Sequence, residues 1–284
     1  MRRPIRLNRA IWPTAMQKLQ RGIPDPRRLL EQGIDATVLT ETLQRLKIGT
    51  TYKTTDYDRF PQTTRLLSEL PFATPPVVLD VGASDGSTSL AVMKKLRFTR
   101  YYVTDRHIRA HVYLTHKGMF LSDMDARPWL YVNRCFVIHN DLDGAEWPYN
   151  AIAARVFKTF DASKRRDERD IYMINPDLAA KRGDRIRIEQ YNIFDTWEHE
   201  KADLVIAANL LNRVYFSDAD LQKGLRSLRN AMRDGAVLAV IENRNTDDGS
   251  IEQSSVFRRS GNRFLAEARI GAGSDIHELV AALE

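Results

Sequence analysis

The chain alternates between short apolar runs and longer segments in which apolar residues recur every three or four positions. Strands are predicted at 77–81, 101–104, 185–192, 203–208 and 235–242. Helices are predicted at about 87–96 and at 218–232, where Ser217 is the expected N-cap. This alternation of strand and helix favours an α/β fold with a doubly wound, mostly parallel sheet.

The C-terminal tail adds further strand-like segments to this pattern. They lie at 256–257, 263–270 and 276–283, with Gly261 in a turn. These segments supply the last strands of the expected sheet, which then has seven strands. We therefore expect one main domain over residues 76–284.

Residues 1–75 show a different pattern, with short helical segments at about 27–32, 36–46 and 59–70. Pro71, Pro75 and Pro76 mark the boundary to the first strand. We expect residues 1–75 to form an N-terminal helical extension.

Residues 107–185 are too long for one crossover between the second and third strands. Segments 112–121 and 129–139 have the pattern of strands, with a candidate tight turn at His116-Lys117-Gly118, and 147–160 has the pattern of a helix. This predicts an insertion made of a hairpin plus a helix. Its aromatic residues could line a pocket, cover an apolar patch or form a homodimer interface, because exposed hairpin edges invite pairing. They are Tyr113, Phe120, Trp129, Tyr131, Phe136, Trp147 and Tyr149.

Composition narrows the possible classes. The 284 residues carry a formal net charge of +6 and a single cysteine, Cys135, which excludes an internal disulfide framework or a zinc site built from cysteines. No spacing of His, Cys, Asp and Glu resembles a metal site. No apolar stretch is long enough for a membrane helix and no secretory segment is evident, so we expect a cytoplasmic protein. The basic residues are spread along the chain, which favours a solvated surface over nucleic-acid binding.

The strand at 77–81 ends in the pattern Asp-x-Gly-x-x-x-Gly, formed by Asp80, Gly82 and Gly86. A strand followed by a glycine turn and a helix start lets backbone lie against a charged ligand. The spacing is not the Gly-x-Gly-x-x-Gly of dinucleotide sites. An acid at the strand end suits a ligand with a cationic end better than one that carries phosphates, which disfavours a nicotinamide dehydrogenase.

Polar residues follow three further strands. Asp105 follows the second strand, Asn192 the third, and residues 209–213 the fourth. Open α/β sheets bind ligands at the carboxyl ends of their strands. This order resembles the class I S-adenosylmethionine-dependent methyltransferases over about 77–106 and 185–243.

The resemblance implies that S-adenosyl-L-methionine is the cofactor, with S-adenosyl-L-homocysteine as the product. It implies that the turn of Gly82, Ala83 and Gly86 approaches the methionine and ribose, and that Asp80 helps to hold the ammonium group. Asp105 would accept hydrogen bonds from the ribose hydroxyls. From each residue alone, Asp80 could instead be a helix cap and Asp105 a surface acid.

The same resemblance implies roles on the later strands. Asn192 would contact the adenine amino group, and Ile193 or Phe194 would pack against the adenine ring. Asn209, between Ala208 and Leu210, would border the transferable methyl. Considered singly, Asn192 could be a turn residue, and Asn209 could satisfy buried backbone groups.

A narrower similarity links the chain to the chemotaxis-receptor glutamate methyltransferases. Those enzymes also have a helical N-terminal extension, an Asn after the third strand and a run similar to Asn212-Arg213-Val214-Tyr215-Phe216. Their Gly-Glu-Glu-Pro-Tyr-Ser-like run is absent here, where Gly86-Ser87-Thr88-Ser89 stands instead.

We expect a methyltransferase that acts on an oxygen or nitrogen nucleophile of a small or medium-sized acceptor. The alternatives are a methyltransferase for a macromolecule, either a protein carboxyl group or RNA, and a non-catalytic binding module. Methyl transfer needs alignment above all, and a base where the nucleophile holds its proton tightly. His107, just after Asp105, and Tyr215 are the expected catalytic residues; His111, His139 and Glu242 are further candidates for the base.

Overall fold

The structure is a computed structural model, which describes residues 5–8, 24–48, 51–53, 58–140, 147–164, 170–246 and 249–284. The chain divides into two compact units. One unit comprises residues 1–54 and 107–176, and the other comprises residues 55–106 and 177–284. In the described ranges, no helix combines the length and the apolar character needed to cross a membrane.

The second unit contains a mixed sheet of seven strands among its described residues. Its spatial order is β11-β5-β4-β12-β13-β14-β15. The first five strands in this order are parallel, and β14 and β15 continue from β13 as an antiparallel meander. The bounds are β4 Val77–Val81, β5 Arg100–Asp105, β11 Ile186–Gln190, β12 Ala202–Ala208, β13 Met232–Thr246, β14 Gly249–Ser260 and β15 Arg263–Ile270. The α/β class and the expected parallel strands are confirmed.

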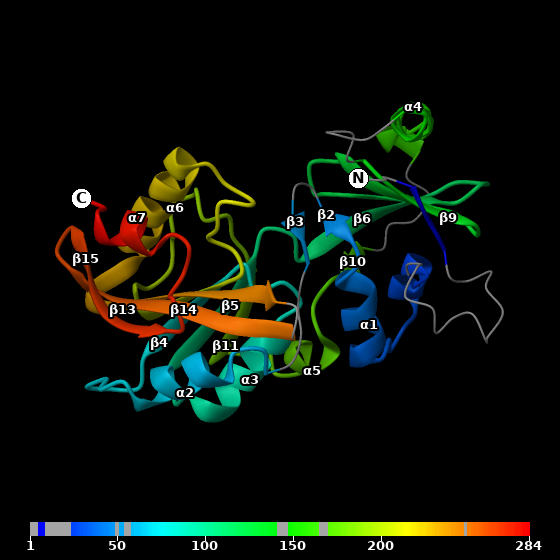
Figure 1. The fold of residues 1–284 in the computed structure, drawn as a ribbon. Coiled ribbons are helices and arrows are strands. Elements are labelled where there is room, and N and C mark those ends of the chain that lie inside the picture. The colour runs from blue at the N-terminus through cyan, green and yellow to red at the C-terminus, as the bar shows by residue number, and fades with distance from the viewer. Residues whose placement is uncertain are drawn as a thin grey trace. The chain divides into compact units, whose positions relative to one another are not determined.

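Helices cover both faces of this sheet. Figure 1 shows α2 and α3 against one face and α6 and α7 against the other. Their bounds are α2 Pro61–Glu69, α3 Ser87–Lys95, α6 Asp218–Ala231 and α7 His277–Ala281. Ser217 caps α6 as expected, because its hydroxyl accepts a hydrogen bond from the Asp220 backbone N–H at 3.2 Å.

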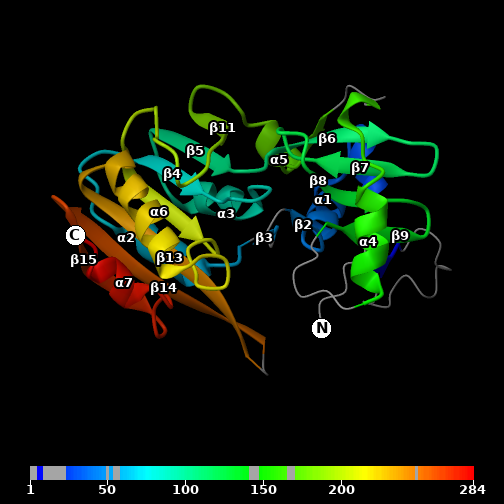
Figure 2. The ribbon, with the colours of Figure 1, turned by 90° about the horizontal axis from the view of Figure 1, so that it is seen from above.

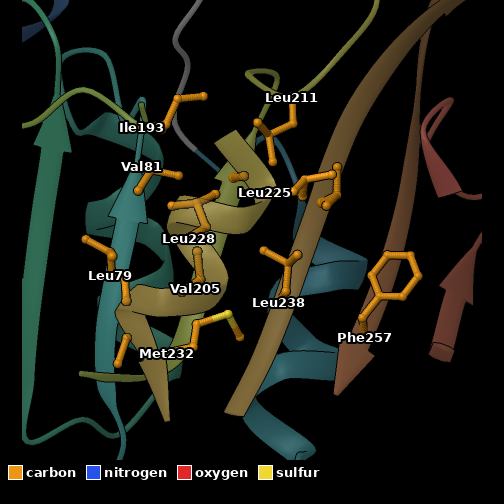
Figure 3. Packing of buried hydrophobic residues seen from close by; sticks show 14 of the residues in the cluster. Leu79, Val81, Ile193, Val205, Leu211, Leu225, Leu228, Met232, Leu238 and Phe257 are labelled. Carbon is orange, nitrogen blue, oxygen red and sulfur yellow. The ribbon is translucent and has the colours of Figure 1, made fainter. Parts of the chain in front are cut away.

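The α6 face of the sheet holds the main apolar core of this unit. Leu225 and Leu228 of α6 are fully buried, and they pack against strand residues that include Leu79 and Val205, as Figure 3 shows. The mostly apolar sequences of the central strands fit this position, because parallel strands that lie between two layers of helices are buried on both faces.

The C-terminal tail differs from the expectation in one element. Residues 276–283 were expected to form a strand, but they contain helix α7. Ile276, Val280 and Leu283 are all buried against the core, and their spacing of four and three residues is that of a helix face. The expectation of a strand was therefore wrong.

The first unit holds a sheet of its own, with six strands among the residues described and the order β1-β9-β8-β7-β6-β10. All neighbouring pairs in it are antiparallel. The bounds are β1 Ile5–Leu7, β6 Arg109–Leu114, β7 Met119–Ser122, β8 Pro128–Val132, β9 Phe136–His139 and β10 Asp170–Tyr172. The expected hairpin is thus part of a larger sheet. The candidate turn at 116–118 joins β6 and β7, and the segment 129–139 is also a pair of strands, β8 and β9.

Both faces of this second sheet are covered. Figure 2 shows α4 (Tyr149–Phe157) across one face, where it packs on Tyr113, Phe120 and Tyr131. On the other face, Leu39 and Leu43 from the N-terminal part share a core with the strands. The remaining elements are the short helices η3 Pro26–Leu30, α1 Ala36–Leu43, η4 Ala162–Lys164 and α5 Pro176–Ala179, and the pair β2 Lys47–Ile48 and β3 Thr51–Tyr52.

The N-terminal residues are therefore not a purely helical extension. The three residues of β1 pair with β9, a partner about 130 positions away in the chain. Such a short strand has no periodicity to detect, and the partner that defines it is distant in the sequence. Residues 1–54 group with 107–176, while residues 58–75 belong to the unit of the parallel sheet.

Candidate functional site

The parallel sheet has a topological switch point between β4 and β12. From β4 the chain proceeds outward to β5 and β11, and from β12 it proceeds outward to β13 in the other direction. Loops that leave two adjacent strands in opposite directions leave a crevice at the carboxyl edge, where open α/β sheets bind ligands. The glycine turn after β4 and residues 209–213 after β12 flank this point.

The turn after β4 alternates between ordinary and left-handed backbone. Gly82, Ser84 and Gly86 have φ angles of 66°, 60° and 81°. Backbone hydrogen bonds fix it: the Ala83 N–H donates to the Thr104 carbonyl at 2.9 Å, and the Gly86 N–H donates to the Ala83 carbonyl at 2.9 Å. The turn is thus tied to β5 before α3 begins.

Packing explains the two glycines independently of any ligand. A Cβ on Gly82 would lie 2.8 Å from the side chain of Leu210, which follows β12. A Cβ on Gly86 would lie 2.1 Å from the side chain of Leu178, which is fully buried. Both positions therefore need glycine for their left-handed φ and for the neighbour that packs on them.

Asp80 is buried beneath the turn, with 3% of its surface exposed. Its Oδ2 accepts hydrogen bonds from the Ser89 hydroxyl at 2.7 Å and from the Tyr101 hydroxyl at 2.9 Å. Burial disfavours the charged form and raises the pKa of Asp80 to about 6, although both hydrogen bonds act in the opposite direction. The Asp80 carboxyl thus joins β4, α3 and β5, and its expected contact with an ammonium group stays a prediction.

Asp105 lies at the end of β5, beside the turn. Its Oδ2 accepts a hydrogen bond from the backbone N–H of Ser84 at 2.9 Å. The structure therefore brings together two of the expected parts of the site, the glycine turn and the acid that follows the second predicted strand. A carboxylate has several acceptor positions, so Asp105 can hold the turn and also accept hydrogen bonds from a ligand.

Ser84 is a residue that sequence reasoning missed. Only 7% of the surface of Ser84 is exposed, and its hydroxyl has no hydrogen-bond partner among the described residues. The signal in the sequence was weak, because a serine between two glycines is ordinary turn composition.

The three residues 192–194, which follow β11, differ in how deeply they are buried. Asn192 accepts a hydrogen bond from the Phe194 N–H at 3.3 Å through its side-chain oxygen, the arrangement of a turn residue. Ile193 is buried against Gly224 of α6. Phe194 is only partly buried and lies edge-to-face with Phe216 at 5.5 Å between ring centroids. Of the two candidates for the adenine ring, Phe194 is therefore the more exposed one.

Asn209 joins the ends of β12 and β13. It has a left-handed φ of 54°, its N–H donates to the Ile241 carbonyl at 2.7 Å, and its side-chain oxygen accepts the Asn243 N–H at 2.8 Å. Tyr215 lies in the following turn, which the side chain of Asn212 stabilises by accepting its N–H at 3.2 Å. These contacts support the backbone, and the roles of Asn209 and Tyr215 toward a ligand stay predictions.

The candidate histidines belong to the unit of the antiparallel sheet, while the glycine turn belongs to the other unit. His107 is the first residue of that segment. His111 pairs with Asp170 through Nδ1 at 2.7 Å, and His139 is buried. The catalytic role of His107 stays a prediction.

Glu242 lies at the carboxyl edge on β13, one position beyond Ile241, which pairs with Ala208 of β12. Its Oε1 accepts the backbone N–H of Asp275 at 3.0 Å. Burial and the neighbouring Asp275 carboxyl raise the pKa of Glu242 to about 7. The sequence alone did not indicate this pairing, because Asp275 is 33 positions away. In the described part of the chain, no group of three or more metal-ligating side chains occurs.

Comparison with known proteins gave structural neighbours only. No family model matches the chain, and no curated protein matches its sequence. Among solved structures, the mitomycin 7-O-methyltransferase MmcR is 17% identical with a TM-score of 0.34, over 66% of this chain and 38% of that one. An O-methyltransferase family protein from Burkholderia thailandensis is 15% identical with a TM-score of 0.36, over 78% and 45%.

A third structure is an O-methyltransferase from neocarzinostatin biosynthesis in complex with S-adenosyl-L-homocysteine and 1,4-dihydroxy-2-naphthoic acid. It is 16% identical with a TM-score of 0.34, over 66% of this chain and 39% of that one. All three are named as methyltransferases, and the matched region spans less than half of the length of each.

Proposed function

We propose that the chain is an S-adenosylmethionine-dependent methyltransferase that acts on an oxygen or nitrogen nucleophile of a small or medium-sized acceptor. One observation carries the proposal: at the switch point of the parallel sheet, the Asp105 carboxylate accepts the N–H of Ser84 in the glycine turn. An acid fixed beside a left-handed turn suits a ligand that carries a ribose and a cationic group better than a phosphate ligand, which the carboxylate would repel.

The residues at this edge fit the cofactor. The carboxylate of Asp105, which is only partly buried, offers acceptor positions beside the turn in addition to the one that holds the Ser84 N–H. When bound, the cofactor supplies a methyl group activated by its sulfonium. The turn and Asp105 would hold the nucleoside part, and Leu210 and Asn209 would border the end that carries the methyl.

The protein must then align the acceptor and exclude water. Where the nucleophile holds its proton, a base with a pKa near the working pH is most effective. Glu242, with its pKa of about 7, is suited to accept such a proton. His107 and Tyr215 remain the other candidates, each to be tested by substitution.

Calorimetric titration with S-adenosyl-L-homocysteine tests the proposal without knowledge of the acceptor. We expect binding by the parent chain and at least 10-fold weaker binding by Asp105→Ala, because a charge-assisted hydrogen bond to the ligand and the anchor of the turn are both lost. Asp184→Ala is the matched control, since the Asp184 side chain is fully exposed and forms a surface ion pair with Arg187 at 3.3 Å.

Thermal melts of both variants establish that they fold. Absence of binding by the parent chain at millimolar ligand would refute the proposal and favour a non-catalytic binding module. Equal affinity of Asp105→Ala and the parent would show that the ligand binds elsewhere.

A further inference from the structure

The loop between β15 and α7 is attached to the sheet through its backbone N–H groups. The Ser274 N–H donates to the hydroxyl of Ser255 on β14 at 2.9 Å. The next N–H, that of Asp275, donates to Oε1 of Glu242 on β13 at 3.0 Å. These bonds hold the carboxyl of Asp275 within hydrogen-bonding reach of the carboxyl of Glu242.

Two carboxyl groups in contact favour a state in which they hold one proton between them. Two ionised carboxylates repel each other, and neither has a proton to donate to the other. Burial of Glu242 acts in the same direction, and together with Asp275 it raises the pKa of Glu242 to about 7. The residue opposite Glu242 on β14 is Gln253, which is neutral and leaves this balance unchanged.

Arg213, in the loop after β12, distinguishes the two carboxyls. Its backbone N–H donates to Asp275 Oδ2 at 3.3 Å, and its guanidinium donates to the Asp275 carbonyl and pairs with Asp218. Its charge interacts more strongly with Asp275 than with Glu242. Arg244, two positions beyond Glu242 on β13, favours the Glu242 carboxylate, as a nearby cation does. Asp275 is thus suited to stay ionised, and Glu242 to take up and release the proton.

Glu242 lies beside the residue expected to border the transferable methyl. The carbonyl of Ile241 accepts the Asn209 N–H at 2.7 Å, and the Asn209 side chain accepts the Asn243 N–H at 2.8 Å. Asn209 therefore binds the strand on either side of position 242. The carboxyl pair is next to the place proposed for the acceptor.

We propose that Asp275 is a positioning residue that makes Glu242 the proton acceptor of the reaction, because its carboxylate accepts a hydrogen bond from the Glu242 acid once that acid has formed. The proton of the acceptor's O–H or N–H passes to the Glu242 carboxylate, and the acceptor keeps the electron pair of that bond. This inference rests on the proposed function. It deepens that function by choosing Glu242 over His107 and Tyr215 as the base.

Carbon NMR of protein labelled at the glutamate side-chain carboxyls measures the titration of Glu242 directly. The signal of Glu242 is assigned by its absence from Glu242→Gln. We expect a midpoint near pH 7 in the parent, and a midpoint lower by about one pH unit or more in Asp275→Asn, because a neighbouring like charge is lost. Asp218→Asn is the matched control, since it removes another acid that Arg213 binds, at 2.8 Å, and should move the midpoint by less than about 0.3 pH unit.

Thermal melts establish that the variants fold, and calorimetry with S-adenosyl-L-homocysteine separates the two proposals. An unchanged midpoint in Asp275→Asn, or an equal fall in Asp218→Asn, overturns the assignment of Asp275. We expect Asp275→Asn to bind S-adenosyl-L-homocysteine within twofold of the parent, and a larger loss would mean that Asp275 acts on the cofactor, which also overturns it. If the parent does not bind S-adenosyl-L-homocysteine, the proposed function fails, and the role of the pair toward an acceptor fails with it, whatever the titration shows.

Discussion

The substitution Asp80→Asn tests what the buried charge of this carboxyl does to the stability of the fold. Asp80 is buried and accepts hydrogen bonds from Ser89 and Tyr101 through one oxygen. An asparagine oxygen can accept the same two hydrogen bonds. The variant therefore keeps the contacts and removes the charge, which is the part that burial penalises.

The size of the effect follows from the pKa of Asp80, which is raised from 3.8 to about 6. Because the folded state binds the proton more tightly than the unfolded state does, Asp80 costs stability as the pH rises from about 4 to 6, and the cost is constant above that. A shift of this size corresponds to about 3 kcal/mol at pH 8 and to less than about 1 kcal/mol at pH 4.

Denaturant or thermal unfolding at the two pH values measures the difference. We expect Asp80→Asn to be more stable than the parent at pH 8, by up to about 3 kcal/mol, and nearly equal to it at pH 4. Asp184→Asn, which removes an exposed carboxylate, is the control. Its stability relative to the parent should be the same at the two pH values. If Asp80→Asn were less stable than the parent at pH 8, the buried carboxylate would be stabilised by its surroundings and the argument would be wrong.

Three further predictions concern the fold around the site. Gly86→Ala should lower the free energy of unfolding by about 3 kcal/mol, because backbone strain adds to the overlap of the new methyl group with Leu178. Gly235 also has a left-handed φ, of 77°, but has open space around it, so Gly235→Ala should lower the free energy of unfolding by only about 1 kcal/mol. Equal losses in the two variants would contradict the overlap. Burial lowers the pKa of His277, so the stability contributed by its neutral form should be lost as the pH falls below about 6.5. The difference in melting temperature between the parent and His277→Gln should therefore shrink from pH 7.5 to pH 5.5. A difference that widens over this range would refute the prediction. Glu252→Ala should cost about 2 kcal/mol in denaturant unfolding, because this buried carboxylate accepts two backbone N–H groups at the start of α2; a loss below about 0.5 kcal/mol would contradict that role.

The sequence was sufficient to predict the parallel part of the fold. Strands such as β4 and β12 are short, mostly apolar and largely buried, so each is visible as a local run without knowledge of its partner. Helix α6 was visible for the same reason, since its cap and its apolar face are both local.

The antiparallel sheet was only partly predictable. Within the strand-like segment 112–121, the sequence indicated a tight turn at 116–118, and the structure has a turn there in which the Thr115 N–H donates to the Gly118 carbonyl at 2.7 Å. The sequence did not indicate that 129–139 is likewise two strands. The participation of residues 5–7 depends on pairing with β9, and a pairing between distant segments leaves no mark on either segment alone.

The candidate site was likewise predictable in part. Asp105 and the glycine turn were expected at one edge of the sheet, and the hydrogen bond between Asp105 and Ser84 brings them together. The orientation of Asp80 toward Ser89, and the contact between Glu242 and Asp275, depend on side-chain directions that periodicity does not fix. The sequence indicates which positions reach the edge, whereas the packing decides what each side chain does there.

The shared core of Leu39 and Leu43 with Val112 and Leu130 has a consequence for how the chain is made. Synthesis proceeds from the N-terminus, so the early segment leaves the ribosome well before its partner strands exist. It must keep its apolar face from other contacts while β4 and β5 are added. We therefore expect the antiparallel unit to complete late and slowly, since its contacts join distant parts of the chain, and a nascent chain stopped near residue 105 to be prone to aggregation.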